Sequence, residues 1–538
     1  MNLNGIHLKN FRIFRDQGFA LRPLTVIVGP NSSGKSSIFK ALQLLNENIE
    51  RCDRLFFTDK THGLGSFELT KTKDAEEGLE ISLRQTKELT NPNGHDPKNF
   101  DIEYAYNFDR LKNSSEPIAE LKEFRLSVNG HCFLKVENVY HEVERGSRGE
   151  KLLQSKAEKI SKIYFDLSHV TNFLHERGDL FYRYDPPAIE KEKDNEEDKS
   201  ESEEAGKEKK EGDDNEESES KSKSAKEMLE EDIELSLKMF GGYKANPIIA
   251  KKSINEILIP LADTQEIFDW LGDLWEKYES DVDNEKVGRI PVMDRDFIES
   301  ANKRLKEVLK DLFGRPLPIF SFPAFRGLQK YFYTPSDEKG TLENVIFRFW
   351  RNKNEFDLDF LGEWLEKFEI IDEAKADVLT INKLGDLSNT LQIKLDGQNL
   401  ADYGFGVTQL VPIILTVAGL PPKKDPNRKE EQLLLIEEPE SHLHPKLQTK
   451  LADFFVEAMG KFKVRFAIET HSEYLIYNLR LKAKESNTLR EEMLIHYINA
   501  REGDFREITL DENGIMSDDF GDGFTDESSR LLEKFWDF

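Results

Sequence analysis

Eight consecutive residues, Gly29 to Ser36 (GPNSSGKS), constrain the fold of this chain more than any other feature. They match the phosphate-binding pattern G-x-x-x-x-G-K-S, and they stand directly after the apolar run LTVIV and before a helical pattern. This context matters because the backbone N–H groups of such a loop and the N-terminus of the next helix together bind phosphate. At an average Gly usage of about 7%, a chance match in this length is expected only on the order of 10⁻² times. The sequence therefore predicts a nucleotide-binding α/β domain.

Each part of the loop has a predicted role toward ATP and Mg²⁺, the two cofactors that the motif implies. We expect Lys35 to neutralise the β- and γ-phosphates and the hydroxyl of Ser36 to ligate the metal. Ser37 is expected to lie near the α-phosphate. The predicted ATP-binding residues are Gly29, Pro30, Asn31, Ser32, Ser33, Gly34, Lys35, Ser36 and Ser37.

The apolar run LLLIEEP contains two adjacent carboxylates, Glu437 and Glu438, where a buried strand would deliver acids to the phosphate side of a sheet. We expect Glu437 to hold the metal, directly or through water, and Glu438 to polarise the attacking water as general base. By itself such a run is equally typical of a solvated strand end. The accompanying P-loop favours the catalytic interpretation.

Three histidines lie in or near these segments. His471 follows the strand-like run VRFAI, and its position at a strand end predicts a sensor of the γ-phosphate, although local hydrogen bonds alone would also account for it. His442 and His444 form an HxH pair, which suggests a metal site. A role in an interface loop is favoured instead, because no third ligand is evident and Pro445 marks a helix start.

Composition limits the classes of function. The chain has 538 residues and a formal net charge of -27, which weakens any function in which the whole surface binds nucleic acid. It contains no run of about 20 apolar residues and no signal-peptide pattern, so we expect a cytoplasmic protein without membrane association. The two cysteines, Cys52 and Cys132, form no CxxC pair and fit a reducing compartment.

Several further segments carry a resemblance to a known family. Together with the P-loop, the segments IHLKNFRIF, FPAFRGLQKYFY, YGFGVTQ, EEPESHLHP and ETHSEYLI resemble ABC-class ATPases of the SMC and recombination-repair kind. The resemblance is closer to the bacterial OLD-like (overcoming lysogenization defect) ATPases used in phage defence. It covers about half of the chain.

The resemblance implies that two heads sandwich two ATP molecules, so that the chain forms a homodimer or a higher homo-oligomer. Each glycine-rich signature would complete the site of the other subunit, and Ser441 to His444 would lie in the contact between heads. The residues assigned to the signature are Gly404, Gly406, Thr408 and Gln409. A plain helix-entry turn is the alternative, because GFGVTQ departs from the usual LSGGQ. No glutamine stands where the lid contact to magnesium is expected, and LGSFELT occupies that place.

The predicted fold class is α/β: an ABC-type P-loop ATPase head with an antiparallel β arm and an inserted helical lid. Runs such as EISLR and EFRLSVNG alternate as antiparallel strands do, whereas residues 190–223 offer almost nothing apolar to bury. The opening is expected to form two strands, Ile6 to Phe14 and Phe19 to Val28. The predicted segments are 1–78, the N-terminal part of the head with the P-loop; 79–165, a β-rich arm; 166–224, a connection with a disordered acidic linker; 225–315, a helical insertion; 316–480, the C-terminal part of the head; and 481–538, a small C-terminal subdomain.

The length of the chain after His471 bears on whether this protein is predicted to contain a nuclease domain. OLD-family nucleases append a Toprim domain, whereas fewer than 70 residues follow His471 here, so we expect an ATPase without a nuclease in the same chain. The favoured hypothesis is the sensor or scaffold ATPase of an anti-phage defence system, which acts with a separate effector, expected to be a nuclease. One alternative is a DNA-binding repair or chromosome-maintenance ATPase, for which KKDPNRK and LRLKAK offer positive charge. A transporter head and a switch that uses ATP binding alone are further alternatives.

Overall fold

The computed structural model describes residues 2–48, 54–57, 63–89, 98–110, 118–143, 156–165, 248–250, 319–324, 331–334, 342–374, 377–384, 390–425, 431–521 and 527–536. The predicted acidic linker 166–224 lies outside these residues. So does nearly all of the predicted helical insertion 225–315, of which only Ile248–Ala250 is described, and these residues form a strand.

A six-stranded sheet forms the centre of the described structure, in the order β11-β15-β16-β3-β17-β18. All neighbouring pairs are parallel except β17 and β18. Its strands are β3 (Leu24–Val28), β11 (Ile319–Phe322), β15 (Gln432–Glu437), β16 (Val464–Glu469), β17 (Met493–Asn499) and β18 (Asp504–Ile508). Strands β3, β16 and β17 are buried along their whole length, as expected for parallel strands that are covered on both faces.

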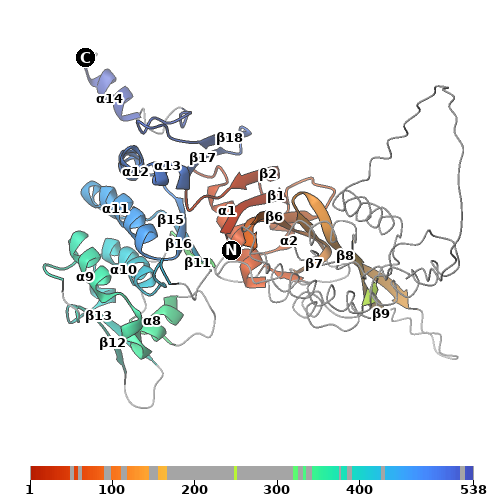
Figure 1. Ribbon diagram of the computed structural model, residues 1–538, viewed down its shortest axis with the longest axis horizontal. Helices are drawn as coiled ribbons and strands as arrows, with labels where there is room; N and C mark the ends of the chain where they lie inside the picture. The colour runs from red at the N-terminus through yellow and green to blue at the C-terminus, as the bar shows by residue number, and fades with distance from the viewer. Residues whose placement is uncertain are drawn as a thin grey trace, which may run out of the picture.

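Different layers cover the two faces of this sheet (Figure 1). On one face, Ile27 of β3 packs in a core with the P-loop helix and a large antiparallel sheet. On the other face, Val26 and Val28 pack in a second core with the remaining helices. The helices are α1 (Lys35–Asn48), α8 (Leu342–Arg351), α9 (Leu358–Lys367), α10 (Phe405–Ala418), α11 (Pro445–Lys461), α12 (Glu473–Glu485), α13 (Asn487–Glu492) and α14 (Glu527–Trp536). Among the described residues, no helix combines the length and apolar character that crossing a membrane requires.

The antiparallel sheet has nine strands, in the order β10-β9-β8-β7-β6-β5-β1-β2, with β4 beside β7. Its strands are β1 (Asn2–Phe11), β2 (Phe14–Ala20), β4 (Arg54–Phe56), β5 (Leu79–Leu89), β6 (Lys98–Arg110), β7 (Ile118–Val128), β8 (His131–Val143), β9 (Lys156–Phe165) and β10 (Ile248–Ala250). The short helix α2 (Phe67–Thr70) lies between β4 and β5 in the sequence. The predicted arm therefore shares its sheet with the first two strands of the chain, because β5 pairs with β1.

The expected single strand from Phe19 to Val28 is wrong. Strand β2 ends at Ala20 and β3 begins at Leu24, and the two strands belong to different sheets. Pro23 lies between them, and proline lacks the backbone N–H that a continuous strand interior would need. The two sheets are tied together nearby, because the buried Arg465 of β16 donates to the carbonyl oxygens of Leu3 (2.6 Å) and Leu21 (3.1 Å).

A small sheet and two 3₁₀ turns complete the described elements. The sheet contains β12 (Leu379–Lys383), β13 (Leu391–Leu395) and β14 (Gln398–Asn399). The turns are η2 (Lys353–Glu355) and η3 (Leu400–Asp402), and η3 leads directly toward the first turn of α10.

The C-terminal segment corrects one predicted boundary. Residues 481–538 are expected to form a separate subdomain, yet β17 inserts beside the P-loop strand, with Ile495 opposite Val26. All seven residues of β17 are buried, and this burial is available only inside the central sheet. The last strands thus belong to the ATPase head.

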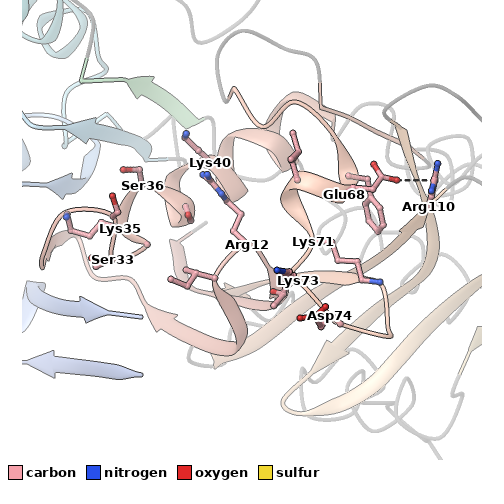
Figure 2. A pocket seen from close by; sticks show the side chains of 18 of the residues that line it. Arg12, Ser33, Lys35, Ser36, Lys40, Glu68, Lys71, Lys73, Asp74 and Arg110 are labelled. Carbon is pink, nitrogen blue, oxygen red and sulfur yellow. Dashed lines mark ion pairs between the residues drawn. The ribbon is translucent and has the colours of Figure 1, made fainter. Parts of the chain in front are cut away.

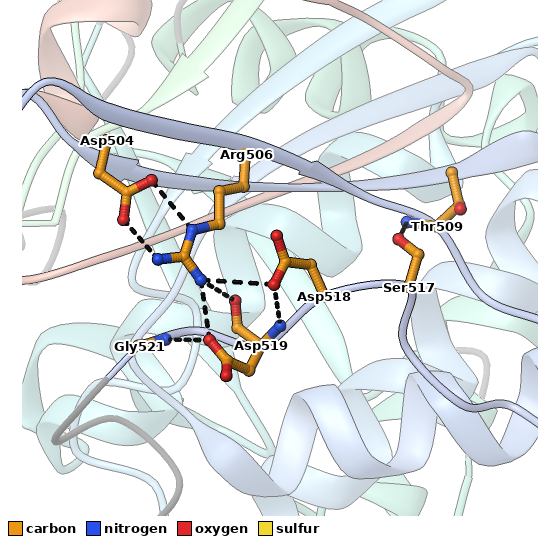
Figure 3. A network of polar contacts seen from close by, with 7 residues as sticks. All are labelled: Asp504, Arg506, Thr509, Ser517, Asp518, Asp519 and Gly521. Carbon is orange, nitrogen blue, oxygen red and sulfur yellow. Dashed lines mark hydrogen bonds and ion pairs between the residues drawn. The ribbon is translucent and has the colours of Figure 1, made fainter.

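An exposed ion network fixes the course of the chain after β18 (Figure 3). The guanidinium group of Arg506 lies 2.7 Å from Asp504, 2.8 Å from Asp519 and 3.4 Å from Asp518. Asp519 also accepts a hydrogen bond from the backbone N–H of Gly521. Single surface ion pairs contribute little to stability, but this network holds the loop after β18 in one place.

Candidate active site

The P-loop is held in its conformation by β17. Gly29 and Gly34 have φ values of 147° and 110°, which residues with a Cβ atom rarely adopt. A Cβ atom on Gly29 would lie 2.1 Å from the carbonyl oxygen of Ile498, and the N–H of Ala500 donates to the carbonyl of Ser33 at 3.1 Å. The loop therefore packs against backbone from the far end of the chain.

Gly29→Ala is expected to lower ATP affinity at least 10-fold, because the new methyl group would displace the loop or β17. Titration with a fluorescent ATP analogue measures the change. Gly460→Ala is the matched control, because a Cβ atom on Gly460 meets no atom within 4 Å, and alanine favours the helix there. Equal affinities of the two variants would contradict this account of Gly29.

Two side chains of the P-loop, Lys35 and Ser33, are hydrogen-bond donors that could bind an anion. The Lys35 Nζ donates to the carbonyl oxygens of Gly29 (3.0 Å) and Pro30 (2.8 Å), and burial lowers the pKa of Lys35. The buried hydroxyl of Ser33 has no hydrogen-bond partner among the described residues. A phosphate oxygen would accept from both groups, because the Ser33 hydroxyl has no acceptor among the described residues and the third N–H of the Lys35 ammonium group can also donate.

Glu469, the last residue of β16, is a site residue that the sequence analysis missed. Its Oε1 accepts a hydrogen bond from the Ser36 hydroxyl at 3.1 Å and lies 3.9 Å from the Lys35 Nζ. The pKa of Glu469 is raised to about 7, chiefly by burial and also by Glu437 and Glu438, while Ser36 and Lys35 oppose the shift. A carboxylate at the end of a fully buried strand is the sequence signal that points to Glu469. The pattern VRFAI predicts a strand that ends one residue earlier, at Ile468, and so leaves Glu469 outside it.

The two predicted acids lie at the end of the adjacent strand. Glu437 is opposite Glu469 in the register of β15 and β16, and its Oε2 accepts from the N–H of Ala324 at 3.3 Å. Glu438 has a φ of 45°, and its N–H donates to the carbonyl of Glu469 at 2.7 Å. The Ser441 hydroxyl donates to the Glu438 carboxylate at 2.9 Å. Backbone and side chain of Glu438 are therefore both oriented by neighbours.

His471 stands on the loop after β16, where its side chain is exposed. Its N–H donates to the carboxylate of Glu440 at 2.6 Å, and Glu440 is itself buried, which raises the pKa of that carboxyl group. Partial burial lowers the pKa of the His471 imidazole and so does Lys35, while Glu438 raises it. The imidazole is therefore neutral near pH 7, so that one ring nitrogen can donate a hydrogen bond and the other can accept one. Glu440 is a second residue that the sequence analysis missed.

The donors gathered here fit Mg²⁺ and ATP. Hydroxyl and carboxylate oxygens are the ligands that Mg²⁺ prefers, and Ser36, Glu437 and Glu469 supply them on three neighbouring elements. In the part of the chain that the structure describes, no group of three or more His, Cys, Asp or Glu side chains forms a metal site by itself. In nucleotide sites, phosphates and waters provide most of the ligands of Mg²⁺.

A cavity of about 1040 Å³ extends from the P-loop to the segment around α2 (Figure 2). Arg12 and Lys40 lie close together on its wall, and burial lowers the pKa of both side chains. Arg12 is exposed and Lys40 is partly exposed, and the charge of Arg12 lowers the pKa of Lys40 further, a repulsion that an anionic ligand in the cavity would offset. Further polar residues at the far end are Glu68, Lys71, Lys73, Asp74, Asp109 and Arg110.

The predicted signature residues divide into two groups. Gly404 is the exposed N-cap of α10, and a Cβ atom on Gly406 would lie 3.0 Å from the carbonyl oxygen of His442. Thr408 and Gln409 are each 3% exposed, and they bond to the carbonyl oxygens of Phe405 and Ala324. In this conformation these two side chains bond within their own chain, because the second turn of α10 is covered. Their predicted contact with a second subunit stays a prediction.

The HxH pair is explained by local structure. The imidazole of His442 lies 5.3 Å from the exposed ring of Phe405, and the His444 Nδ1 accepts from the N–H of Lys446 at the start of α11. The predicted contact of 441–444 with a second head remains a prediction.

The order of the strands and the groups at their ends define a class. A strand that leads into the P-loop, a neighbouring strand that ends in Glu469 and the next strand, which ends in Glu437, are combined with an antiparallel sheet over the P-loop helix. This is the head of an ABC-type P-loop ATPase. The model of the AAA ATPase domain family matches residues 1–476, which is most of the chain, and the chain belongs to this family. It is accordingly an enzyme that hydrolyses ATP to ADP and phosphate.

Solved structures of similar proteins were also found. The Smc head domain with an extended coiled coil bound to the C-terminal domain of ScpA, from Pyrococcus furiosus, is 10% identical, with 99% of each chain covered and a TM-score of 0.34. The SMC head domain from Thermotoga maritima is 11% identical, covering 95% of this chain and 100% of that one, with a TM-score of 0.31. The recombination mediator protein RecF with ATP is 14% identical, covering 94% and 97%, also with a TM-score of 0.31. No curated protein matches the chain in sequence.

Proposed function

We propose that ATP binding joins two copies of this chain head to head, and that the nucleotide-controlled dimer serves as sensor or scaffold in an anti-phage defence system. The observation that supports this dimer is the solvent-exposed N-terminus of α10. Gly404 and Phe405 are exposed there, and Phe405 is 57% exposed despite its apolar ring. A helix N-terminus attracts phosphate, so this end of α10 is suited to the γ-phosphate of a second head.

The same end of α10 is connected to the catalytic loop of its own head. Phe405 lies against His442, and Gly406 approaches the backbone of that residue. The loop begins at Glu438, whose carboxylate is held by Ser441. A partner nucleotide that shifted α10 would therefore act on the loop that orients the general base, which supports coupling between dimerisation and hydrolysis.

In the proposed mechanism, Ser36 and Glu437 would hold Mg²⁺, which when bound would neutralise part of the phosphate charge. Lys35 exchanges its bonds to Gly29 and Pro30 for bonds to phosphate oxygens. Glu438 accepts a proton from the attacking water, and His471 contacts the γ-phosphate.

Phe405→Asp is expected to abolish ATP-dependent dimerisation while ATP affinity of the single head changes less than about threefold. The carboxylate would repel the phosphates of the second head, whereas the residue lies outside the cavity beside the P-loop. Light scattering of the variant in a Glu438→Gln background, with and without ATP, measures the mass. Tyr477→Asp on α12 is the control, since Tyr477 is similarly exposed at 46%. A dimer that persists in Phe405→Asp would contradict the proposed interface.

The defence role is supported by the sequence motifs shared with OLD-like ATPases, and it implies a separate effector, expected to be a nuclease. Bacteria that carry the gene with its neighbours should resist phages, and Lys35→Ala should remove that protection. Metal-dependent DNA cleavage by the purified chain alone would contradict the division of labour, as would a neighbourhood without any effector gene.

The DNA-repair alternative depends on basic surfaces. In LRLKAK, Arg480 donates to the carbonyl of Gly514 and Lys482 pairs with Asp453 at 2.7 Å, so both charges are engaged within the chain. ATPase activity that rises on addition of double-stranded DNA, in a salt-sensitive manner, would nevertheless favour this alternative.

A further inference from the structure

Strand β16 lies between the P-loop strand β3 and the acid-bearing strand β15. Its last residue, Glu469, pairs in register with Glu437 on one side and with Ile27, two residues before the P-loop, on the other. Because the carboxyl ends of these parallel strands meet at one edge, Glu469 is central among the groups that are predicted to bind the metal and the phosphates.

The carboxylate of Glu469 is built into the site and only partly satisfied. The residue is 5% exposed, and its Oε2 is buried without a hydrogen-bond partner among the described residues. An unsatisfied buried carboxylate oxygen costs free energy, so the site is incomplete as it stands. A hydrogen-bond donor or a cation would satisfy such an oxygen, and a water bound to a cation is a strong donor.

The neighbouring Lys35 does not supply the missing partner for the Glu469 carboxylate. The Lys35 Nζ is 3.9 Å from Oε1, beyond hydrogen-bond distance, and it donates instead to the carbonyl oxygens of Gly29 and Pro30. Phosphate binding would draw Lys35 further into bonds with the nucleotide. The carboxylate would then need another positive partner.

The bond from Ser36 indicates how Glu469 acts. The hydroxyl hydrogen of Ser36 points to Glu469, and this leaves the lone pairs of the Ser36 Oγ for a metal. Hydrogen-bond partners behind a metal ligand orient it and tune metal affinity.

We propose that Glu469 is a positioning residue of the metal site, which orients the Ser36 hydroxyl toward the divalent cation and accepts a hydrogen bond from a metal-bound water. This inference rests on the proposed ATP and metal site at Ser36 and Glu437.

Glu469→Gln tests the inference in the full-length chain. Glutamine keeps an oxygen that accepts from Ser36 but removes the negative charge. Mn²⁺ replaces Mg²⁺, and electron paramagnetic resonance measures free Mn²⁺ during titration of the protein with a non-hydrolysable ATP analogue bound. We expect Mn²⁺ affinity to fall roughly 10–100-fold, the range typical for loss of a group that supports a metal ligand. Affinity for the analogue in excess chelator should change less than about twofold.

Glu120→Gln is the matched control, because Glu120 is also a buried glutamate, 7% exposed, on β7 of the antiparallel sheet. It should leave Mn²⁺ affinity unchanged. Unchanged Mn²⁺ affinity in Glu469→Gln would overturn the inference. So would an equally large loss of metal-free nucleotide affinity, which would show that Glu469 acts through Lys35. If the wild-type chain bound no nucleotide at all, both the proposed ATP site and the proposed role of Glu469 would be refuted.

Discussion

Glu438→Gln is expected to lower the steady-state rate of ATP hydrolysis by about 10²–10⁴-fold, the contribution of a well-placed general base. The wild-type residue is held in an unusual conformation, with a φ of 45°, by a bond from its N–H to the carbonyl of Glu469. Strain of this kind, about 1–3 kcal/mol, persists where the surrounding structure enforces it, commonly at functional sites. The amide can still accept from Ser441, so the loop should keep its shape while the proton acceptor is lost.

Phosphate release in steady state and in a single turnover measures the effect, and ATP should remain bound in a trapped dimer. Lys35→Ala should instead lose both ATP binding and dimerisation. Glu457→Gln is the control, because Glu457 is a partly exposed residue of α11, far from the P-loop in the sequence, that pairs with Lys367 at 3.0 Å. Turnover within threefold of wild type in Glu438→Gln would refute the assignment of the general base, and identical behaviour of the Glu438 and Lys35 variants would refute their separate roles.

The second large effect concerns the stability of the nucleotide-free protein as a function of pH. The pKa of Glu469 is raised from its ordinary value of 4.5 to about 7 in the folded chain, chiefly by burial. The folded state therefore retains a proton that the unfolded state has lost. This contribution to stability is fully present below pH 4.5 and is lost as the pH rises toward 7. At 1.36 kcal/mol for each pKa unit, the loss is about 3 kcal/mol.

Glu469→Gln removes this ionisation, so the variant should match wild type near pH 4.5 and exceed its stability by about 3 kcal/mol above pH 7. Urea unfolding followed by circular dichroism, in chelator and without nucleotide, compares the two proteins from pH 4.5 to 8. The buried His496 changes stability in the opposite direction, since its pKa is lowered and its contribution is lost as the pH falls. It is common to both proteins and cancels in the difference. Parallel curves would show that Glu469 ionises normally.

The motifs of the active site were readable because their chemistry is local. The P-loop needs a buried strand, two glycines and a helix start within about a dozen residues, and all of them occur between Leu24 and Ser37. The acids Glu437 and Glu438 likewise follow directly from an apolar strand. Their order along the chain predicted a parallel sheet, and the structure contains one.

Other features depended on contacts between distant residues. Strand β17 enters the central sheet and places Ile498 against Gly29, more than 460 positions away in the sequence. This strand is buried on both faces because of its place in the sheet. The sequence of a short apolar run does not indicate which strands will lie beside it. From the sequence alone, this strand is therefore expected to belong to a separate subdomain.

The sequence by itself determined the chemistry: a phosphate-binding loop, a pair of acids and a histidine at the ends of strands. Only the tertiary structure decided which groups meet, because β16 lies between β3 and β15 and so brings Glu469 to Ser36 and Glu437. It also decided that Thr408 and Gln409 are covered while Gly404 is open, since helix packing selects the exposed face of α10. Residue types and their spacing indicate the chemistry that a side chain can perform, whereas packing determines which other groups it contacts.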